Sequence, residues 1–213
     1  MGVGSLIAGI HSLRTALAAT PLGLDESSGG VRRSKPNGNS NGYKATFHKP
    51  KNVGDRIRRI KEQIEKGRRN PAVRAFAVKA VSQKCGDRFC IPERDYWGEV
   101  KAVFNATRKN VRYVRDGLGM DTYQAANRTL EFSGGDCDDY SITLGSALLT
   151  IGFPIKLRVI QTIGSPDFNH IFLLVGLPPK NPSKWVSLDA SVDQPAGWHA
   201  PRNMIARVRD YEV

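Results

Sequence analysis

The sequence lacks the features that would assign it to several classes of protein. Its 213 residues include only three cysteines, and a sparse, odd count argues against a disulfide-based scaffold. No apolar stretch approaches the roughly 18–20 residues that a membrane-spanning helix needs. The first twenty residues also lack the basic start and clean apolar stretch of a secretory signal. We therefore expect a soluble protein that is made in the cytoplasm.

Metal-binding patterns are also scarce. Cys85 and Cys90, in "CGDRFC", could close a small disulfide or remain two reduced thiols. A zinc site there would need a second pair of Cys or His ligands, and none follows. The acidic run around Cys137 lacks the alternating spacing and terminal Glu of a calcium loop. We therefore expect no metal and no cofactor.

Acidic residues are scarce in one part of the chain. The net charge is +12, and residues 30–112 alone carry 22 Lys or Arg against seven Asp or Glu. Such an excess favours binding to phosphates or to an acidic protein surface, although a run of charge is usually a solvated face. Nucleic acid is therefore a candidate partner for residues 30–112.

Composition and periodicity divide the chain into four segments. Residues 1–20 have apolar positions at helical spacing and could form an amphipathic docking helix. Residues 21–52 are rich in Ser, Gly, Asn, Pro and cations, which predicts a flexible basic linker or arm. Residues 53–94 form a basic segment with a helical pattern. Residues 95–213 are expected to form the main domain.

The main domain changes from helical to strand-like patterning along its length. Helices are predicted at residues 94–114, 122–132 and 136–152. Strands are predicted at residues 155–163, 169–177 and 184–192. This order predicts an α+β fold in which the helix that carries Cys137 packs against an antiparallel sheet.

The stretch "GGDCDDY" at residues 134–140 places the last cysteine among three aspartates. If Asp136 caps the next helix, Cys137 lies in the first turn, where unpaired N–H groups and the helix dipole favour a thiolate. Asp138 and Asp139 suit a first helical turn, and we expect their carboxylates to point to solvent and to oppose ionisation only weakly. A lowered Cys137 pKa is therefore expected.

A nucleophilic thiol needs a base and a group that orients the base. Two of the four histidines lie in the predicted tail and arm, which leaves His170 and His199. His170 opens one predicted strand and Asp189 lies near the end of the next, so the two are natural neighbours across an antiparallel pair. A lone His on a strand is more often structural, but Cys137, His170 and Asp189 could meet at one edge of the sheet.

These residues resemble the core of the transglutaminase-like superfamily, a branch of the papain-like thiol enzymes. The resemblance rests on "TLEFSGGDCDDYSITLGSALLTIGFPIKLRVI", "NHIFLLV" and "WVSLDASV", and it covers about residues 95–195. The matched positions are Gly135-Asp136-Cys137, Gly152-Phe153-Pro154, His170 and Asp189. Family members often carry a Trp after the His, whereas this chain has Ile171-Phe172, so no substrate subsite is assigned.

The resemblance implies a papain-like or transglutaminase-like core with N-terminal helices, a Cys-bearing helix and a C-terminal antiparallel sheet. It also implies a nucleophilic Cys137, with His170 as general base and acid and Asp189 orienting His170. The backbone N–H of Cys137, at a helix start, is the expected oxyanion donor. Gln124 and Trp97 are the candidates for the second donor.

The implied reaction is acyl transfer through a thioester. If water attacks the thioester, the chain is a cysteine protease or amidase; if an amine attacks it, the chain is a transglutaminase. Short relatives are encoded by tailed bacteriophages among structural genes, which implies a protein in the host cytoplasm or in the virion. Its partners would be a protein or peptide substrate and virion structural proteins. The alternative function is a structural or adaptor protein of a virion, with little catalysis, whose basic arm binds nucleic acid or partner proteins.

Overall fold

The structure is a computed structural model that describes residues 50–116 and 122–213. The docking helix predicted at residues 1–20 and almost all of the arm predicted at residues 21–52 lie outside the described residues. Within the described ranges, no helix combines the length and the hydropathy that crossing a bilayer requires.

Helices come first along the described chain and a sheet comes last. The helices are α2 (Val53–Gly67), α3 (Pro71–Val81), α4 (Tyr96–Asn110), α5 (Ala126–Phe132) and α6 (Cys137–Thr150). The C-terminal strands are β5 (Ile155–Thr162), β6 (His170–Leu177), β7 (Lys184–Leu188) and β8 (Ile205–Glu212), with a 3-10 turn at Arg202–Met204 before β8. Two short pairings complete the fold, an antiparallel one of β1 (Lys84–Cys85) with β2 (Arg88–Phe89) and a parallel one of β3 (Arg112–Tyr113) with β4 (Gly134–Gly135).

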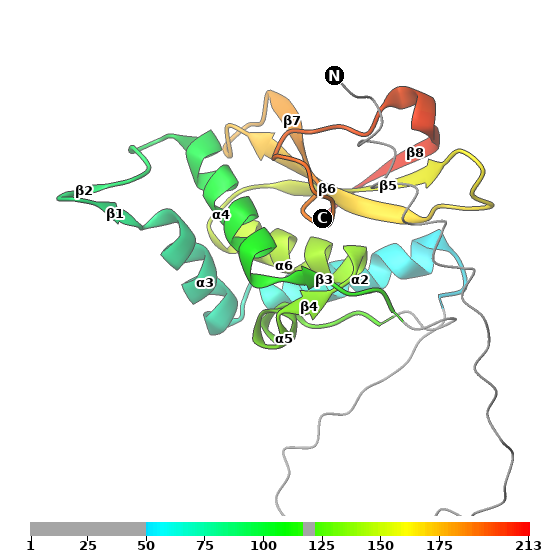
Figure 1. Cartoon of the computed structure of the whole chain (residues 1–213), viewed down its shortest axis with the longest axis horizontal. Helices are drawn as coiled ribbons and strands as arrows, with labels where there is room; N and C mark the ends of the chain where they lie inside the picture. The colour runs from blue at the N-terminus through cyan, green and yellow to red at the C-terminus, as the bar shows by residue number, and fades with distance from the viewer. Residues whose placement is uncertain (1–49, 117–121) are drawn as a thin grey trace, which may run out of the picture. The chain divides into compact units, whose positions relative to one another are not determined.

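The C-terminal strands form one antiparallel sheet in the order β7-β6-β5-β8 (Figure 1). β6 lies between β5 and β7 and is buried from Ile171 to Leu177. The pairing of β6 with β5 places His170 opposite Ile160, and its pairing with β7 places Leu173 opposite Leu188. The predicted α+β fold, with its Cys-bearing helix and its antiparallel sheet, is confirmed.

Strand β8 was not predicted from the sequence. It lies at the edge of the sheet, and most of its side chains are exposed. It is held to β5 by a ladder of backbone hydrogen bonds and by ion pairs, including Arg158 Nε with Asp210 Oδ1 at 2.7 Å. Within β8 only Ile205 and Tyr211 are partly buried against the apolar clusters, so the strand shows no clear apolar alternation.

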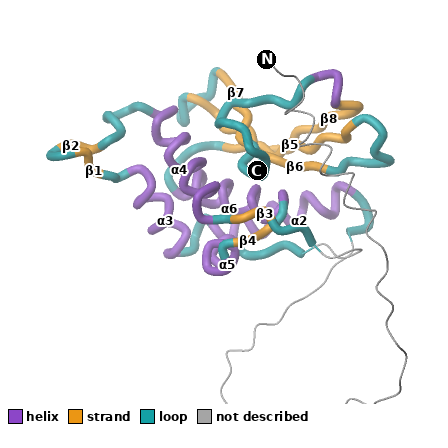
Figure 2. The backbone as a smooth tube through the Cα atoms, in the orientation of Figure 1, coloured by secondary structure: helices purple, strands orange, loops and turns teal. Residues whose placement is uncertain are grey.

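Helix α6 lies at the centre of the fold, between the sheet and the other helices (Figures 1 and 2). It is buried on all sides from Cys137 to Leu148, as expected for a helix that is covered all round. A Cβ added at Gly145 would come within 2.9 Å of Ile155 Cδ1 and 3.2 Å of Ile64 Cδ1. α6 therefore approaches both β5 and α2 closely at this point, and a larger residue there would require these isoleucine side chains to shift.

Helices α2 and α3, which the sequence places in a separate basic segment, share the core of the main domain. Ile57, Ile60 and Ile64 of α2 are at most 3% exposed and belong to the same apolar cluster as Leu144 of α6 and Leu173 of β6. Arg58 and Lys66 of α2 are exposed to solvent, away from this apolar side, as the strongly amphipathic pattern of the helix predicts.

Several predicted boundaries differ from the structure: the helix predicted at residues 122–132 begins at Ala126, and the strand predicted at residues 184–192 ends at Leu188. The helix predicted at residues 94–114 ends at Asn110, and Val111 leads into β3, where Arg112 and Tyr113 pair with β4. Cys85 and Cys90, for which the sequence left two states open, form a disulfide that closes the β1–β2 hairpin. The residues of that hairpin are exposed, and Figure 2 shows it extending away from the helices.

Replacement of one isoleucine of α2 tests whether this helix is part of the core. Ile60 is fully buried, whereas Ile163 is 61% exposed. We expect Ile60→Ala to lower the free energy of unfolding by about 2–5 kcal/mol, because it leaves a cavity, and Ile163→Ala to change it by less than about 0.5 kcal/mol. Urea unfolding followed by circular dichroism measures both, and equal losses for the two variants would contradict a core role for α2.

Candidate active site

The candidate nucleophile lies where the first turn of α6 meets the start of β6. Cys137 is the first residue of α6 and is 7% exposed. The backbone of Ile171 acts to lower the pKa of this thiol, and the hydroxyl of Ser141 lies 2.8 Å from the Cys137 carbonyl and 3.5 Å from that of Ile171. These contacts fix the thiol beside the strand that begins with His170. A small void that is too tight to hold a water molecule is lined by Cys137, Ile171 and Asp189, among others.

The structure brings His170 and Asp189 together as the sequence predicted. Nε2 of His170 lies 2.6 Å from Oδ2 of Asp189, and their side chains are 16% and 5% exposed. Asp189 follows β7 directly, so the strand pairing of β6 with β7 sets the distance between the two residues. The hydroxyl of Ser191 donates to the other carboxylate oxygen of Asp189 at 2.8 Å. His170 therefore has only Nδ1 left for exchanging a proton with a reactant.

The sulfur of Cys137 is not hydrogen bonded to His170. Within the described residues its recorded side-chain partners are Nη2 of Arg56 at 3.7 Å and Oδ1 of Asp138 at 3.9 Å. Such loose geometry is common in enzymes without substrate, so it does not remove His170 as a candidate base. The site residues predicted from the sequence remain a hypothesis about function, with His170 and Asp189 paired and Cys137 next to Ile171.

The turn that precedes α6 is built by a capping box. The carboxylate of Asp136 accepts hydrogen bonds from the N–H groups of Asp138 and Asp139, and the side chain of Asp139 accepts from the N–H of Asp136. A Cβ added at Gly135 would come within 2.5 Å of Asp139 Cβ. Only glycine fits at this point, which explains why the stretch "GGDC" opens the helix.

The expectation that Asp138 and Asp139 point to solvent is wrong. Asp138 is 1% exposed and Asp139 is fully buried. Nε of Arg56 donates to both carboxylate oxygens of Asp138, and its Nη2 lies 2.6 Å from Oδ1. The carboxylate of Asp138 therefore has a cation as its partner in place of water, as a buried charge requires.

Asp139 is held by a different set of donors. The backbone N–H of Gln124 donates to Oδ1 at 2.8 Å, and the Gln124 side-chain amide donates to Oδ2 at 3.0 Å. These bonds anchor the segment before α5 to the first turn of α6. The three aspartates around the thiol therefore have three different roles: Asp136 caps the helix, Asp138 pairs with a cation and Asp139 anchors a loop.

The expected lowering of the Cys137 pKa is also wrong for this structure. Burial of the thiol raises its pKa well above the usual value, and the negative charges of Asp138 and Asp136 raise it further. Arg56 and the hydrogen bond from Ile171 oppose this rise. Because the carboxylates are buried beside the sulfur, their charges are less screened than those of solvated aspartates would be.

Burial also changes the ionisation of the neighbouring groups. It raises the pKa of Asp136 to about 8 and that of Asp139 to about 7, and the mutual repulsion of the aspartates adds to the effect. Burial alone would lower the pKa of His170, but the charge and hydrogen bond of Asp189 raise it overall. Near neutral pH, Asp136 and Asp139 therefore carry less negative charge than two fully ionised carboxylates would.

The three candidate oxyanion donors have different positions. The N–H of Cys137 has no acceptor recorded among the described residues, since the Asp136 carboxylate bonds the next two N–H groups. Gln124 lies next to the site, but its amide donates to Asp139 and, at 3.4 Å, to the Gly134 carbonyl. Trp97 packs on Gly197, and its neighbour Tyr96 contacts Phe153 beyond the opposite end of α6. The structure therefore brings Trp97 to neither Cys137 nor His170.

One group of potential metal ligands lies at this site. Single ligand atoms of Asp136, Cys137 and Asp138 lie within 4.8 Å of one another. The guanidinium of Arg56, however, contacts the carboxylate of Asp138 and the sulfur of Cys137. Because that position already has a bound cation, we assign no metal ligands here.

Two residues of the site were missed by sequence reasoning. Arg56 lies 81 residues before Cys137, in a helix whose cations are otherwise typical of a solvated face. The only sequence signal is its place next to Ile57 and one turn before Ile60, at the border of the apolar face. Ser191 follows Asp189 in "DAS", a spacing that allows a short side-chain turn but carries no specific signal.

Comparisons with known proteins give distant structural similarity only. No protein-family model matches the sequence, and no curated protein matches it. The structure is similar to that of a candidate protease from Parabacteroides distasonis ATCC 8503, with a TM-score of 0.46 and 12% identity over 66% of this chain. It is also similar to a candidate cysteine protease from Cytophaga hutchinsonii, with a TM-score of 0.43 and 16% identity over 75% of this chain.

The matched regions make up 30% of the first of these chains and 52% of the second, so this chain corresponds to a part of either. Identities of 12% and 16%, together with TM-scores below 0.5, do not transfer an activity to this chain. Any function has to be argued from the residues of the site.

The raised pKa of Asp136 predicts that stability falls as the pH rises. A carboxyl whose pKa is about 8 when folded and 3.8 when unfolded stabilises the fold most below pH 3.8, and this contribution is lost as the pH passes 8. We expect the free energy of unfolding to fall by about 2 kcal/mol between about pH 6 and pH 9. Urea unfolding at each pH measures it.

Asp136→Asn tests the assignment, because Asn keeps the cap oxygen and removes the charge. This variant should lose less stability over the same pH range. Asp95→Asn is a matched control, since Asp95 caps α4 through the N–H of Gly98, at an exposed position. If both variants keep the full pH dependence, the charge of Asp136 is not its cause.

Proposed function

We propose that this chain is a thiol-dependent acyl-transfer enzyme, acting as a cysteine protease or amidase or as a transglutaminase. Cys137 is the nucleophile, His170 the general base and acid, and Asp189 the residue that orients His170. The observation that carries the proposal is the 2.6 Å contact of His170 with a buried Asp189, at the strand end against which the first turn of α6 packs. A lone structural histidine needs no such carboxylate.

The first half-reaction forms a thioester. Nδ1 of His170 takes the proton of the Cys137 thiol as the sulfur attacks the carbonyl carbon of an amide, and the carbonyl electron pair moves to the oxygen. The N–H of Cys137, at the start of α6, is placed to donate to that oxygen. The carbon–nitrogen bond then breaks, and His170 returns its proton to the departing amine.

The second half-reaction releases the acyl group. Water or a primary amine attacks the thioester carbon while His170 takes a proton from it, and the carbon–sulfur bond breaks as the thiol is protonated again. Water completes a hydrolysis and an amine completes a transamidation. The first step needs a neutral imidazole. Because the pKa of His170 is raised from its usual value of 6.5, the neutral form becomes dominant only above pH 6.5, and the reaction rate should rise with pH there.

A role in the assembly of a bacteriophage virion, in the host cytoplasm or within the particle, is part of this proposal. It is supported by the resemblance of "GGDC", "NHIF" and "SLDASV" to short phage-encoded members of the transglutaminase-like superfamily. The substrate would then be a protein or peptide of the particle. Residues 95–213 would form the transglutaminase-like domain, with α2 and α3 completing its core.

Turnover of unspecified peptides tests the proposal. The full chain is incubated with a complex peptide mixture, with and without a labelled primary amine, and mass spectrometry detects cleaved or amine-linked products. We expect products with the natural chain, none with Cys137→Ala, and a rate about 10²–10⁴-fold lower with His170→Ala.

His199→Ala is the matched control, because His199 is exposed and lies outside the site. It should leave turnover unchanged. Products formed equally well by Cys137→Ala would refute the thiol mechanism, and equal losses for the two histidine variants would refute the specific role of His170.

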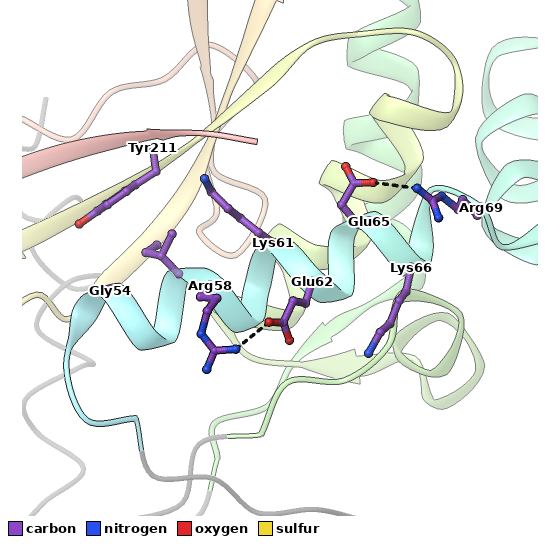
Figure 3. A pocket seen from close by; sticks show the side chains of 9 residues that line it. Gly54, Arg58, Lys61, Glu62, Glu65, Lys66, Arg69 and Tyr211 are labelled. Atoms are coloured by element: carbon purple, nitrogen blue, oxygen red, sulfur yellow. Dashed lines mark hydrogen bonds and ion pairs between the residues drawn. The ribbon is translucent and has the colours of Figure 1, made fainter.

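A second candidate function is a structural or adaptor protein with little catalysis that binds nucleic acid or partner proteins. It is favoured by the burial of Cys137, whose thiol pKa is raised, and by the cations of α2. A groove of about 790 Å³ runs along α2. Figure 3 shows the residues that line it, with Lys61 on the side of Tyr211 from β8. Arg58 pairs with Glu62 and Asp55, whereas Lys61 and Lys66 have no ion pair recorded within the described residues.

Salt dependence separates this second function from the first. If phosphates bind along α2, the affinity for a DNA duplex should fall steeply with salt, and replacing Lys61 and Lys66 with Gln should lower the slope of log K against log salt by about 2. The control replaces Lys180 and Lys184, near β7, in the same way and should keep the slope. Fluorescence anisotropy measures binding, and an affinity that does not change with salt would refute phosphate binding.

A further inference from the structure

Arg56 is the one cation whose recorded contacts include the candidate nucleophile in the described part of the chain. It comes from α2, whereas the other site residues come from α6 and the sheet. Its Nη2 lies 2.6 Å from Oδ1 of Asp138 and 3.7 Å from the sulfur of Cys137. The side chains of Arg56 and Asp138 are 16% and 2% exposed, so the pair is largely removed from water.

We infer that Arg56 is a catalytic residue that stabilises negative charge on the sulfur of Cys137, and that Asp138 is the residue that positions it. The inference rests on the proposed function, because it names a further group of the same site. It separates Arg56 from the other cations of α2, which pair with acids of their own helix or face solvent.

The geometry differs from that of a salt bridge that only joins two helices. Nε of Arg56 lies 3.2 and 3.1 Å from the two oxygens of Asp138, and Nη2 is shared between Oδ1 and the sulfur. The plane of the guanidinium is therefore fixed by Asp138, with one of its N–H groups directed to the reacting atom. A lysine in its place would supply a charge without this fixed direction.

The two charges of the pair act on the sulfur in opposite directions. Arg56 at 3.7 Å favours the thiolate, whereas Asp138 at 3.9 Å disfavours it, and both act through a buried, weakly screened environment. The effect of Asp138 on the thiol pKa is the larger of the two, and Arg56 offsets part of it. Removal of one partner should therefore shift ionisation of the thiol one way, and removal of the other should shift it the opposite way.

Other charged or titratable groups also face Cys137 and contribute to its ionisation. Asp136 lies on its own turn and Tyr113 on β3, and both interact with the thiol; His170 precedes Ile171 on β6, and Asp189, after β7, lines the same void as Cys137. The variants below leave these groups in place, so a difference between variants reports on Arg56 and Asp138. His170 also responds to the pair, since Arg56 lowers its pKa and Asp138 raises it.

The experiment measures the rate of alkylation of Cys137 by iodoacetamide against pH in the full chain, with mass spectrometry of the modified peptide. The midpoint of this pH profile is the pH at which half of the Cys137 thiol is ionised. We expect Arg56→Gln to move the midpoint upward by about 1 pH unit or more, which slows labelling about tenfold at a pH below the midpoint. Asp138→Asn should move the midpoint downward. Arg56→Lys should lie between Arg56→Gln and the natural chain.

Arg58→Gln is the matched control. It lies on the same helix and pairs with Asp55 and Glu62 at an exposed position, so it should leave the midpoint unchanged. Equal midpoints for Arg56→Gln and Arg58→Gln would overturn the inference. A downward shift in both Arg56→Gln and Asp138→Asn would overturn it as well, because a general loosening of the fold would expose the thiol in either case.

A double variant covers the case in which Arg56→Gln does not fold, since that change leaves a buried carboxylate without its cation. Arg56→Met combined with Asp138→Leu removes both charges at similar volume. Its midpoint must lie above that of Asp138→Asn, which keeps Arg56, and identical midpoints would refute the role of Arg56.

Failure of the proposed function gives a different result. Alkylation needs no substrate, so a chain that turns over no peptide can still show the opposite shifts. Conversely, peptide turnover could require Cys137 and His170 while Arg56→Gln leaves the midpoint of alkylation unchanged. That result would support the proposed function and refute the catalytic role of Arg56.

Discussion

The structure around Cys137 depends on one constraint, the burial of a thiol and of the Asp138 and Asp139 carboxylates, next to the half-buried Asp136, in a single turn of a helix. Residues 136–139 open α6, and α6 is enclosed by the sheet and by α2. Buried carboxylates require donors or cations at close range, because water is absent. Backbone N–H groups of the turn donate to Asp136, Gln124 donates to Asp139 and Arg56 donates to Asp138, so two other parts of the chain converge on this turn.

This convergence explains why α2 belongs to the same core as the sheet. Ile57, Ile60 and Ile64 hold the helix against α6, and this packing places Arg56, next to Ile57, beside the thiol. A helix that was only a basic arm would have no reason to bury three isoleucines. The packing of α2 and the charge balance of the turn therefore depend on each other. The apolar contacts of α2 position Arg56, and Arg56 then forms the ion pair with Asp138.

Much of the site could be predicted from the sequence, because each feature has a local signature. "GGDC" indicates a capped helix start, and the strand that begins with His170 and the one followed by Asp189 show the patterning of a buried sheet. Arg56 could not be predicted, since a cation on an amphipathic helix has the same pattern whether it faces solvent or a buried carboxylate. The burial of Asp138 depends on that same distant contact. β8 was missed because an edge strand that pairs through charges has no apolar period.

The ionisation of the thiol follows from this arrangement. Burial raises the pKa of Cys137 well above its usual value, and the pKa of His170 is raised from 6.5 by Asp189. The raised pKa of Cys137 favours a proton on the sulfur over a preformed thiolate. In the proposed mechanism the sulfur therefore becomes nucleophilic as His170 accepts its proton during attack, which is general-base catalysis of a neutral thiol. A fixed cation beside the sulfur matters most in such a site, because it stabilises the charge at the moment it forms and needs no reorganisation to do so.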